Sequence, residues 1–169
     1  MPKKPYSHYT KYAVQDPSGP YEGGVCLWLY KIENGEVFLL FQKRALSVNN
    51  GGFYDSSAGG HIDEGEDPLT AVLRETKEEI GLEISKEDLR FLTSYIEGNK
   101  YIHVYLSDRT GLDDLFTLNY DEVDSIEWVS LADFDKFVEE NIKPPLKKDR
   151  FHLPAVKRFL EEDLKISLK

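Results

Sequence analysis

Three glutamates near the middle of the chain are spaced so that their carboxylates share one side of a helix. Glu75, Glu78 and Glu79 fall within about 100° of one another when each residue turns the helix by about 100°. Their repulsion would cost the helix a few tenths of a kcal/mol for each pair. A hard cation such as Mg²⁺ or Mn²⁺, which prefers oxygen ligands and also coordinates phosphates, would offset that repulsion. The spacing therefore favours a metal site, although three glutamates alone more often mark a solvated surface.

Gly60, Glu66 and Arg74 extend this pattern. Gly60 allows the loop before the helix to approach closely, so that its carbonyl could join a metal shell. Arg74 lies four residues before Glu78 and is placed to pair with it. The full order is Gly60, five residues, Glu66, seven residues, and then Arg74-Glu75-x-x-Glu78-Glu79-x-Gly81 followed by an aliphatic residue. A chance match to so many fixed identities in one chain has a probability of about one in a million.

The helix that carries these side chains has clear start and stop signals. Asp67 followed by Pro68 predicts an N-cap and a first helical position, and Gly81 predicts a left-handed C-terminal stop. The predicted helix runs from about residue 67 to residue 80. An apolar stripe at helical spacing is expected to face the core, roughly opposite the glutamates: Leu69, Val72, Leu73, Thr76 and Ile80.

The stretch 60–82 resembles the Nudix box, with Thr76 where an aliphatic residue is usual. The Thr76 hydroxyl can bond to a carbonyl one turn back, so the resemblance holds. It implies an α/β fold, a Nudix-type α/β/α sandwich with a mixed β-sheet. It also implies an enzyme that uses Mg²⁺ or Mn²⁺ to hydrolyse nucleoside diphosphates linked to another moiety. By position in the motif, the resemblance assigns metal ligation to the Gly60 carbonyl, Glu75, Glu78 and Glu79, and orientation of the loop and helix to Glu66 and Arg74.

The residues before the box resemble the Nudix branch that includes the type I isopentenyl diphosphate isomerases. In those isomerases a cysteine precedes the Gly-His pair and protonates the substrate double bond, and here that position is Gly59. Hydrolysis is therefore favoured over isomerisation. An isoprenoid diphosphate isomerase-like enzyme remains one alternative, and a catalytically silent nucleotide-binding module is another. His61 stands where the isomerases place a metal-binding histidine, and a hydrogen-bonded loop residue is an equal expectation.

Charged residues outside the box supply further candidates. Lys43 and Arg44 end a predicted strand, where a basic residue of similar enzymes faces the diphosphate; an exposed basic strand end is the alternative. Glu122, with Asp121 before it, precedes another predicted strand. Either Glu122 or Glu78 is expected to be the general base that accepts a proton from the attacking water. For Glu122, a solvated loop charge is the alternative.

The remaining pattern predicts a sheet with short connections and helices near the C-terminal end. Asn34-Gly35 is a strong hairpin signal, 47–57 is expected to be a loop, and Ser130 with Asp133 predicts a capping box. Strands are expected at 24–30, 36–42, 89–96, 101–106 and about 123–129, and helices at 130–141 and 154–164.

Composition limits the class of protein. The chain has 169 residues, which suits a single domain at 21–169 preceded by an extended arm at 1–20. A formal charge of −10 argues against sequence-independent nucleic-acid binding. The single cysteine, Cys26, is expected in the core and permits no internal disulfide, which together with the absence of an apolar leader favours the cytoplasm. No apolar run is long enough for a membrane span. The expected partner is a small diphosphate, with a homodimer as a further candidate.

Overall fold

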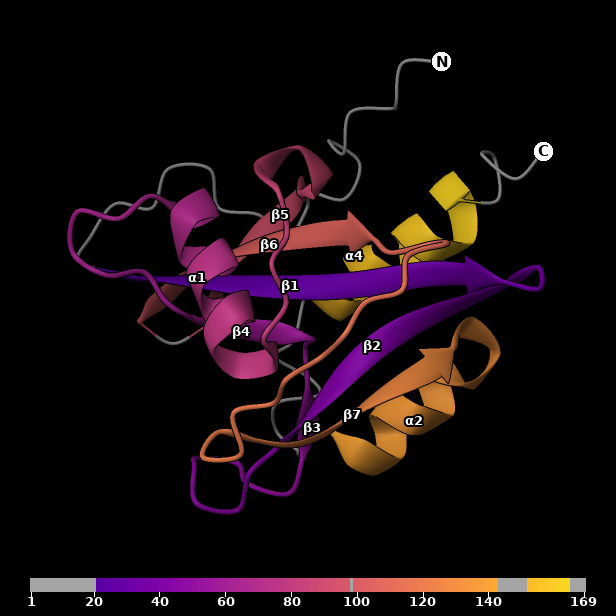
Figure 1. Cartoon of the computed structure of the whole chain (residues 1–169), viewed down its shortest axis with the longest axis horizontal. Coiled ribbons are helices and arrows are strands. Elements are labelled where there is room, and N and C mark those ends of the chain that lie inside the picture. Colours follow the sequence, from indigo (N-terminus) through magenta and orange to yellow (C-terminus); the bar gives the residue numbers. More distant parts are fainter. Residues whose placement is uncertain (1–20, 98, 143–151, 165–169) are drawn as a thin grey trace.

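The computed structural model describes residues 21–97, 99–142 and 152–164. The predicted arm at 1–20 lies outside these residues, as do Gly98 of the second predicted hairpin and the break at 143–151. The described chain forms a mixed seven-stranded sheet with helices on both faces (Figure 1). The predicted α/β sandwich is therefore confirmed. The strands are β1 (Glu22–Glu33), β2 (Glu36–Arg44), β3 (Tyr54–Asp55), β4 (Ala58–His61), β5 (Arg90–Glu97), β6 (Lys100–Asp108) and β7 (Val123–Ser130).

Strand β1 is the centre of the sheet. It runs parallel to β6 and antiparallel to β2 and β4, while β2 also pairs with β3 and β7. The β1–β2 hairpin turns at Asn34 and Gly35, whose φ angles of 51° and 76° are both positive. Two positive φ angles are what a two-residue hairpin needs to match the twist of its strands. The predicted strand at 101–106 thus becomes the parallel neighbour of β1.

Side chains of β1 alternate between the two faces of the sheet, and both faces are buried because helices cover each of them. Val25 and Leu27 pack with residues of helix α1 (Pro68–Ile80), and Cys26 and Trp28 pack on the opposite face. That opposite face is covered by α2 (Phe134–Asn141), α4 (His152–Arg158) and the π-helical turn η4 (Phe159–Asp163). Cys26 is buried in the core, as expected. Among the described residues, no helix is long and apolar enough to cross a membrane.

Ser130 caps the turn that follows it as predicted, but the Asp133 carboxylate returns to the Ser130 hydroxyl and not to its backbone N–H as in a full capping box. The Ser130 hydroxyl accepts a hydrogen bond from the Asp133 N–H at 3.3 Å and donates to the Asp133 carboxylate at 3.1 Å. It begins a short 3₁₀ turn, η3 (Leu131–Asp133), which leads directly into α2. Another 3₁₀ turn, η2 (Lys86–Asp88), connects α1 to β5.

Strands β1 and β2 separate towards the end of the sheet that carries the predicted box. Their register runs only from Tyr30↔Leu39 to the hairpin. Beyond it, the buried Ser57 hydroxyl bridges the gap: it accepts from the Leu29 N–H at 2.9 Å and donates to the Leu40 carbonyl at 2.6 Å. Strand β4 then takes over the edge of β1. This separation leaves room for a cavity between the two halves of the sheet.

The segment 47–57 is only partly the loop that the sequence predicts. Tyr54 and Asp55 form β3 against Lys43 and Gln42, and the glycine-rich residues that follow form β4. The prediction was wrong here because this stretch lacks the alternation of apolar and polar residues that marks a strand. Its pairing comes from the free edges of β1 and β2 that the separation exposes.

Candidate functional site

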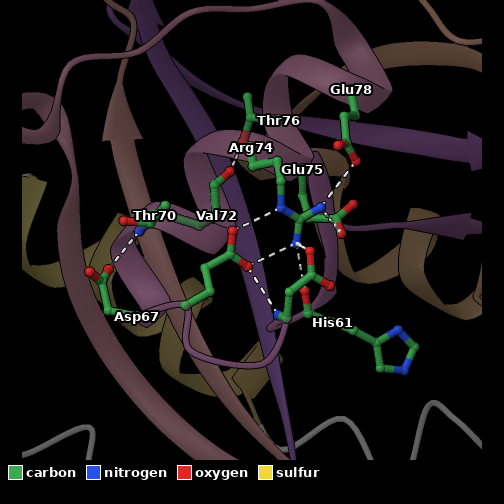
Figure 2. Close-up of polar contacts among 10 residues, drawn as sticks. His61, Asp67, Thr70, Val72, Arg74, Glu75, Thr76 and Glu78 are labelled. Atoms are coloured by element: carbon green, nitrogen blue, oxygen red, sulfur yellow. Dashed lines mark hydrogen bonds and ion pairs between the residues drawn. The ribbon is translucent and has the colours of Figure 1, made fainter.

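Helix α1 begins and ends as its sequence predicts. The Asp67 carboxylate accepts a hydrogen bond from the Thr70 N–H at 2.8 Å, and Pro68 is the first helical residue (Figure 2). Gly81 ends the helix with φ 69°, and its N–H donates to the Lys77 carbonyl at 3.0 Å. The Thr76 hydroxyl donates to the Val72 carbonyl at 2.6 Å, so the unusual Thr satisfies its own polar group. The helix is thereby fixed relative to the loop that precedes it.

The three glutamates do not share an exposed side, which corrects the expectation from helical spacing. The side chain of Glu78 is 53% exposed, that of Glu75 is 14% exposed, and Glu79 is 6% exposed as a residue. The helix buries Ala71, which projects on the same side as Glu75, while Leu69 and Leu73 are only half-buried. Because Ala71 is small, α1 lies with its glutamate side turned towards β4. Glu75 and Glu79 therefore lie between helix and strand.

Two glycines of β4 receive these buried carboxylates. The Gly59 N–H donates to Glu79 Oε1 at 2.7 Å. A Cβ at Gly60 would overlap the Glu75 carboxylate, so only glycine leaves the space that this side chain occupies. The close approach that the sequence suggests for Gly60 is therefore found, and its function is to make room for Glu75.

Arg74 joins the loop and the helix through a dense set of charged hydrogen bonds (Figure 2). Its guanidinium donates to both carboxylate oxygens of Glu66, at 2.9 and 3.0 Å. It also donates to Glu75 at 3.0 Å, to Glu78 at 3.1 Å and to the His61 carbonyl at 2.9 Å. The Arg74 contact is the main reason that the pKa of Glu66 is lowered. Contact between Glu66 and Arg74 is thus present, and their orienting role in catalysis stays a prediction.

Burial and mutual repulsion make the inner carboxylates hard to ionise. Desolvation, with the charges of Glu75, Glu122 and Asp55, raises the pKa of Glu79 to about 8, against the opposing hydrogen bond from Gly59. Desolvation also raises the pKa of Glu75, although Arg74 acts in the opposite direction. A nearby cation would relieve this repulsion and favour the ionised forms.

A cavity of about 570 Å³ lies where β1 and β2 separate. That volume is within the range of small-molecule sites. Of the residues predicted from the sequence, Gly60, His61, Glu75, Glu79, Arg44 and Glu122 line it. Asp55 and Gly59 also line it, although no sequence motif pointed to Asp55.

The remaining predicted site residues lie away from the cavity wall. Glu66 and Glu78 both contact the Arg74 guanidinium, and none of these three residues lines the cavity. Lys43 is turned towards Asp124, with 4.0 Å between its Nζ and the nearest carboxylate oxygen. Arg44, on the next position of the strand, points to the cavity side because adjacent strand residues face opposite ways. The structure thus separates two basic residues that the sequence could not distinguish.

Glu122 reaches the cavity from a loop that is fastened to the C-terminal end of α1. The Asn119 N–H donates to the Glu79 carbonyl at 2.9 Å, and the Asn119 carbonyl accepts from the Glu122 N–H at 3.0 Å. The Thr117 N–H donates to the Ile80 carbonyl at 2.9 Å. Two backbone hydrogen bonds through Asn119 therefore connect Glu79 with Glu122, and no sequence motif marked Asn119.

The donor chemistry of this site suits a hard divalent cation. The candidate donors, the Gly60 carbonyl and the carboxylates of Glu75, Glu79 and Glu122, are all oxygens, as Mg²⁺ prefers. Within the described residues, no three His, Cys, Asp or Glu side chains converge as a metal-binding group. Arg74 explains part of this, since it holds Glu78 away from the cavity and shares Glu75.

Comparison with known proteins agrees with this architecture. A Nudix hydrolase of Clostridium acetobutylicum is 28% identical over 124 residues, which cover 68% of this chain and 60% of the relative. The structure of a C. elegans Ap4A hydrolase complex matches with a TM-score of 0.59 at 23% identity, over 82% of this chain and 97% of that one. The NUDIX domain of Shewanella oneidensis NrtR, complexed with ADP ribose, matches with a TM-score of 0.55 at 18% identity, over 72% and 81%.

A family model matches most of the chain, and this match shows the family. Residues 20–149 match the family model of the NUDIX domain, and this range contains the whole of the box, the cavity lining and Glu122. The chain spans about 60% of the length of its Clostridium relative, so the match concerns this domain. By this match and by its fold, the chain belongs to the NUDIX family.

Proposed function

We propose that this chain is a metal-dependent pyrophosphohydrolase that cleaves a nucleoside diphosphate linked to another moiety by attack of water on phosphorus. The observation that carries the proposal is a pair of carboxylates, the largely buried Glu75 and the buried Glu79, set against Gly59 and Gly60 at the wall of the cavity. Burying two carboxylates side by side is costly unless a positive charge compensates them. The relatives support the class of reaction, since two of them are named as hydrolases.

A divalent ion would be held by the Gly60 carbonyl, Glu75 and Glu79. Glu78, the remaining ligand implied by the box, would join them only by exchanging its contact with Arg74 for the ion. When bound, Mg²⁺ or Mn²⁺ would neutralise the diphosphate and lower the pKa of a coordinated water. Acidic residues dominate the charged lining of the cavity, so a compensating cation is needed before an anionic substrate can enter.

The protein's own groups divide the remaining tasks. Arg74 fixes the direction of Glu75 through a 3.0 Å hydrogen bond and fastens the box loop through Glu66. Arg44 lines the cavity with its guanidinium held by the Asn49 carbonyl at 2.7 Å, where it can stabilise negative charge that develops on the substrate. Lys43 was a candidate for the same role, and its contact with Asp124 argues against it.

Glu122 is the general base that this geometry supports better. Glu122 is exposed, like Glu78, but it lines the cavity with Glu75 and Glu79, whereas Glu78 is absent from the cavity lining and is bound to Arg74. A base must reach the water that it deprotonates, directly or through one further water.

Isomerisation of an isoprenoid diphosphate is disfavoured by a second observation besides the missing thiol. A Cβ at Gly59 would lie 2.7 Å from the Val25 carbonyl oxygen, so a cysteine at this position would force the backbone apart. The essential acid of that mechanism is therefore absent and also sterically excluded. A proton-exchange assay with isopentenyl diphosphate checks this, and exchange at a rate above background would revive the isomerase.

The proposal is tested by Glu75→Gln in a screen of nucleotide sugars, dinucleoside polyphosphates and nucleoside triphosphates. We expect Mg²⁺-dependent release of phosphate-containing products by the wild type and a loss of two or more orders of magnitude in the variant, with unchanged circular dichroism. Glu83→Gln, an exposed carboxylate beyond the helix, is the matched control and should retain activity. Equal rates for Glu75→Gln and wild type would exclude this site, and tight nucleotide binding without cleavage would support a silent binding module instead.

A further inference from the structure

The cavity has a second end, formed by strands β5 and β6 and remote from the box glutamates. Tyr95 pairs with Ile102 and Glu97 pairs with Lys100, so the four side chains lie on one face of the sheet. All four line the cavity, next to Gly24 of β1, which is paired with Ile102. Neither the box nor its resemblance assigns a role to any of these residues.

This end lies about 13 Å from the box loop along the direction of β1. Strand β4 places Gly59 beside Cys26, and β6 places Lys100 beside Glu22, four residues earlier on β1. At about 3.3 Å per residue, four residues span about 13 Å. A substrate whose phosphorus reacts near Glu75 and Glu79 can therefore reach the β5–β6 end with a group that is attached to the diphosphate.

The polar groups at this end are of mixed character. The Tyr95 hydroxyl donates to Glu97 Oε2 at 3.4 Å. Lys100 makes no ion pair with any described residue, whereas Arg44, the other lysine or arginine of the lining, is held by the Asn49 carbonyl and lies 3.8 Å from Asp55. An ammonium and a carboxylate together offer donors and acceptors to one neutral ligand.

This combination disfavours the other kinds of attached group. Glu97 would repel a further phosphate, and the two charged side chains would be desolvated without compensation by an alkyl or isoprenoid chain. A nucleobase requires an aromatic face for stacking, and the Tyr95 ring is 2% exposed. Hydroxyl groups fit, because each can donate to a carboxylate and accept from an ammonium.

We propose that Glu97 and Lys100 form a specificity subsite for a polyhydroxyl group of the substrate, with Glu97 accepting from and Lys100 donating to its hydroxyls. The inference rests on the proposed hydrolysis of a diphosphate at Glu75 and Glu79, and it adds the two residues that recognise a sugar of that substrate. The sugar could be that of the leaving moiety or the ribose of the nucleoside, and both present the same chemistry.

The test uses four adenine nucleotides that each have a diphosphate and differ in the groups attached to it. They are ADP-glucose, its 2′,3′-dideoxyadenosine analogue, the methyl ester of ADP, and ATP. Each is assayed with wild type, Glu97→Gln, Lys100→Gln, and the control Glu87→Gln, whose exposed carboxylate is outside the cavity lining. We expect Glu97→Gln and Lys100→Gln to lower kcat/KM for ADP-glucose by about 10- to 100-fold. The loss of kcat/KM in these variants should disappear for the analogue that lacks the hydroxyls contacted by the subsite. That analogue identifies which sugar is bound.

Two results would overturn the subsite. One is a kcat/KM that Glu97→Gln lowers equally for all four substrates, or that it lowers for none of them. The other is a gain for ATP in Glu97→Gln with its largest loss in Lys100→Gln, which would show a phosphate at this end. Dissociation constants for the α,β-methylene analogue of ADP-glucose separate the two proposals. Binding that weakens in Glu97→Gln, in a protein that hydrolyses nothing, would reject the hydrolase and keep the subsite.

Discussion

Gly60 and Glu75 occupy one space: the carboxylate of Glu75 lies where a side chain on residue 60 would begin. Neither residue is unusual alone, since Gly60 has no positive φ angle and Glu75 is one of many helical glutamates. Their contact is a consequence of how α1 lies on β4. A substitution at Gly60 therefore tests whether activity depends on the position of the Glu75 carboxylate.

Gly60→Ala is expected to lower kcat/KM by about 100-fold while changing the free energy of unfolding little. The added methyl group meets only the flexible end of Glu75, which can turn away, but a displacement of about 1 Å at a reacting centre is enough for such a loss. Steady-state kinetics and urea denaturation measure the two effects. Combined with Glu75→Gln, the substitution should add almost nothing, because both act on one carboxylate. Additive losses would contradict this account.

Replacing Arg74 by Lys should destabilise the protein by about 1–3 kcal/mol although the charge is kept. A lysine cannot reproduce the two-pronged contact with Glu66 together with the hydrogen bonds to Glu75 and the His61 carbonyl. Chemical denaturation provides the number. Lys77→Met on the exposed side of the same helix serves as the control and should leave stability unchanged. Equal stabilities of the Arg74→Lys variant and wild type would show that the network is dispensable.

The stability of the metal-free protein should fall with rising pH because of Glu79. Its native pKa of about 8 exceeds the ordinary carboxyl value of 4.5, so the native state keeps a proton that the unfolded chain releases. This contribution is complete below pH 4.5 and is lost as pH rises through about 8. Glu79→Gln removes it, and in a chelator at pH 8.5 the variant should exceed wild type by a few kcal/mol. A variant whose advantage does not grow between pH 5 and pH 8.5 would refute the buried carboxylate.

Glu122→Gln should reduce kcat by about 10²- to 10⁴-fold at saturating Mg²⁺, as expected for loss of a general base. Asp121→Asn, one residue earlier and exposed, is the control. Glu78→Gln should instead raise the Mg²⁺ concentration needed for half-maximal rate, because Glu78 is the candidate ligand outside the cavity. The reverse pattern would make Glu78 the base.

Gly81→Ala should cost more stability than Gly35→Ala, although both residues have positive φ angles. The Cβ of an alanine at Gly35 would meet no atom within 4 Å, so the substitution destabilises only through the strain of its positive φ angle, by about 1 kcal/mol. At Gly81 the new Cβ would lie 2.7 Å from the Thr117 carbonyl oxygen, in the loop that carries Glu122. Thermal unfolding of both variants gives the comparison, and activity should fall in Gly81→Ala alone. Equal melting temperatures would show that the loop yields freely.

Interactions between residues close in sequence determine several elements of this protein, so the sequence alone predicts them. The limits of α1 follow from Asp67, Pro68 and Gly81, because capping and a left-handed stop depend on neighbouring residues only. The first hairpin follows likewise from Asn34-Gly35. The spacing of the box pointed to the family, and the resemblance to that family implied the fold class. The homodimer and the N-terminal arm stay predictions.

Only the tertiary structure decided which carboxylates are buried and which residues meet at the cavity. Helical spacing gives the angles between Glu75, Glu78 and Glu79, but the roll of α1 on β4 depends on Ala71 and two glycines from a different strand. The separation of β1 from β2, bridged by Ser57, creates the cavity, which Arg44 lines and Lys43 does not. These contacts join residues far apart in sequence, and their energies depend on packing that no single segment contains.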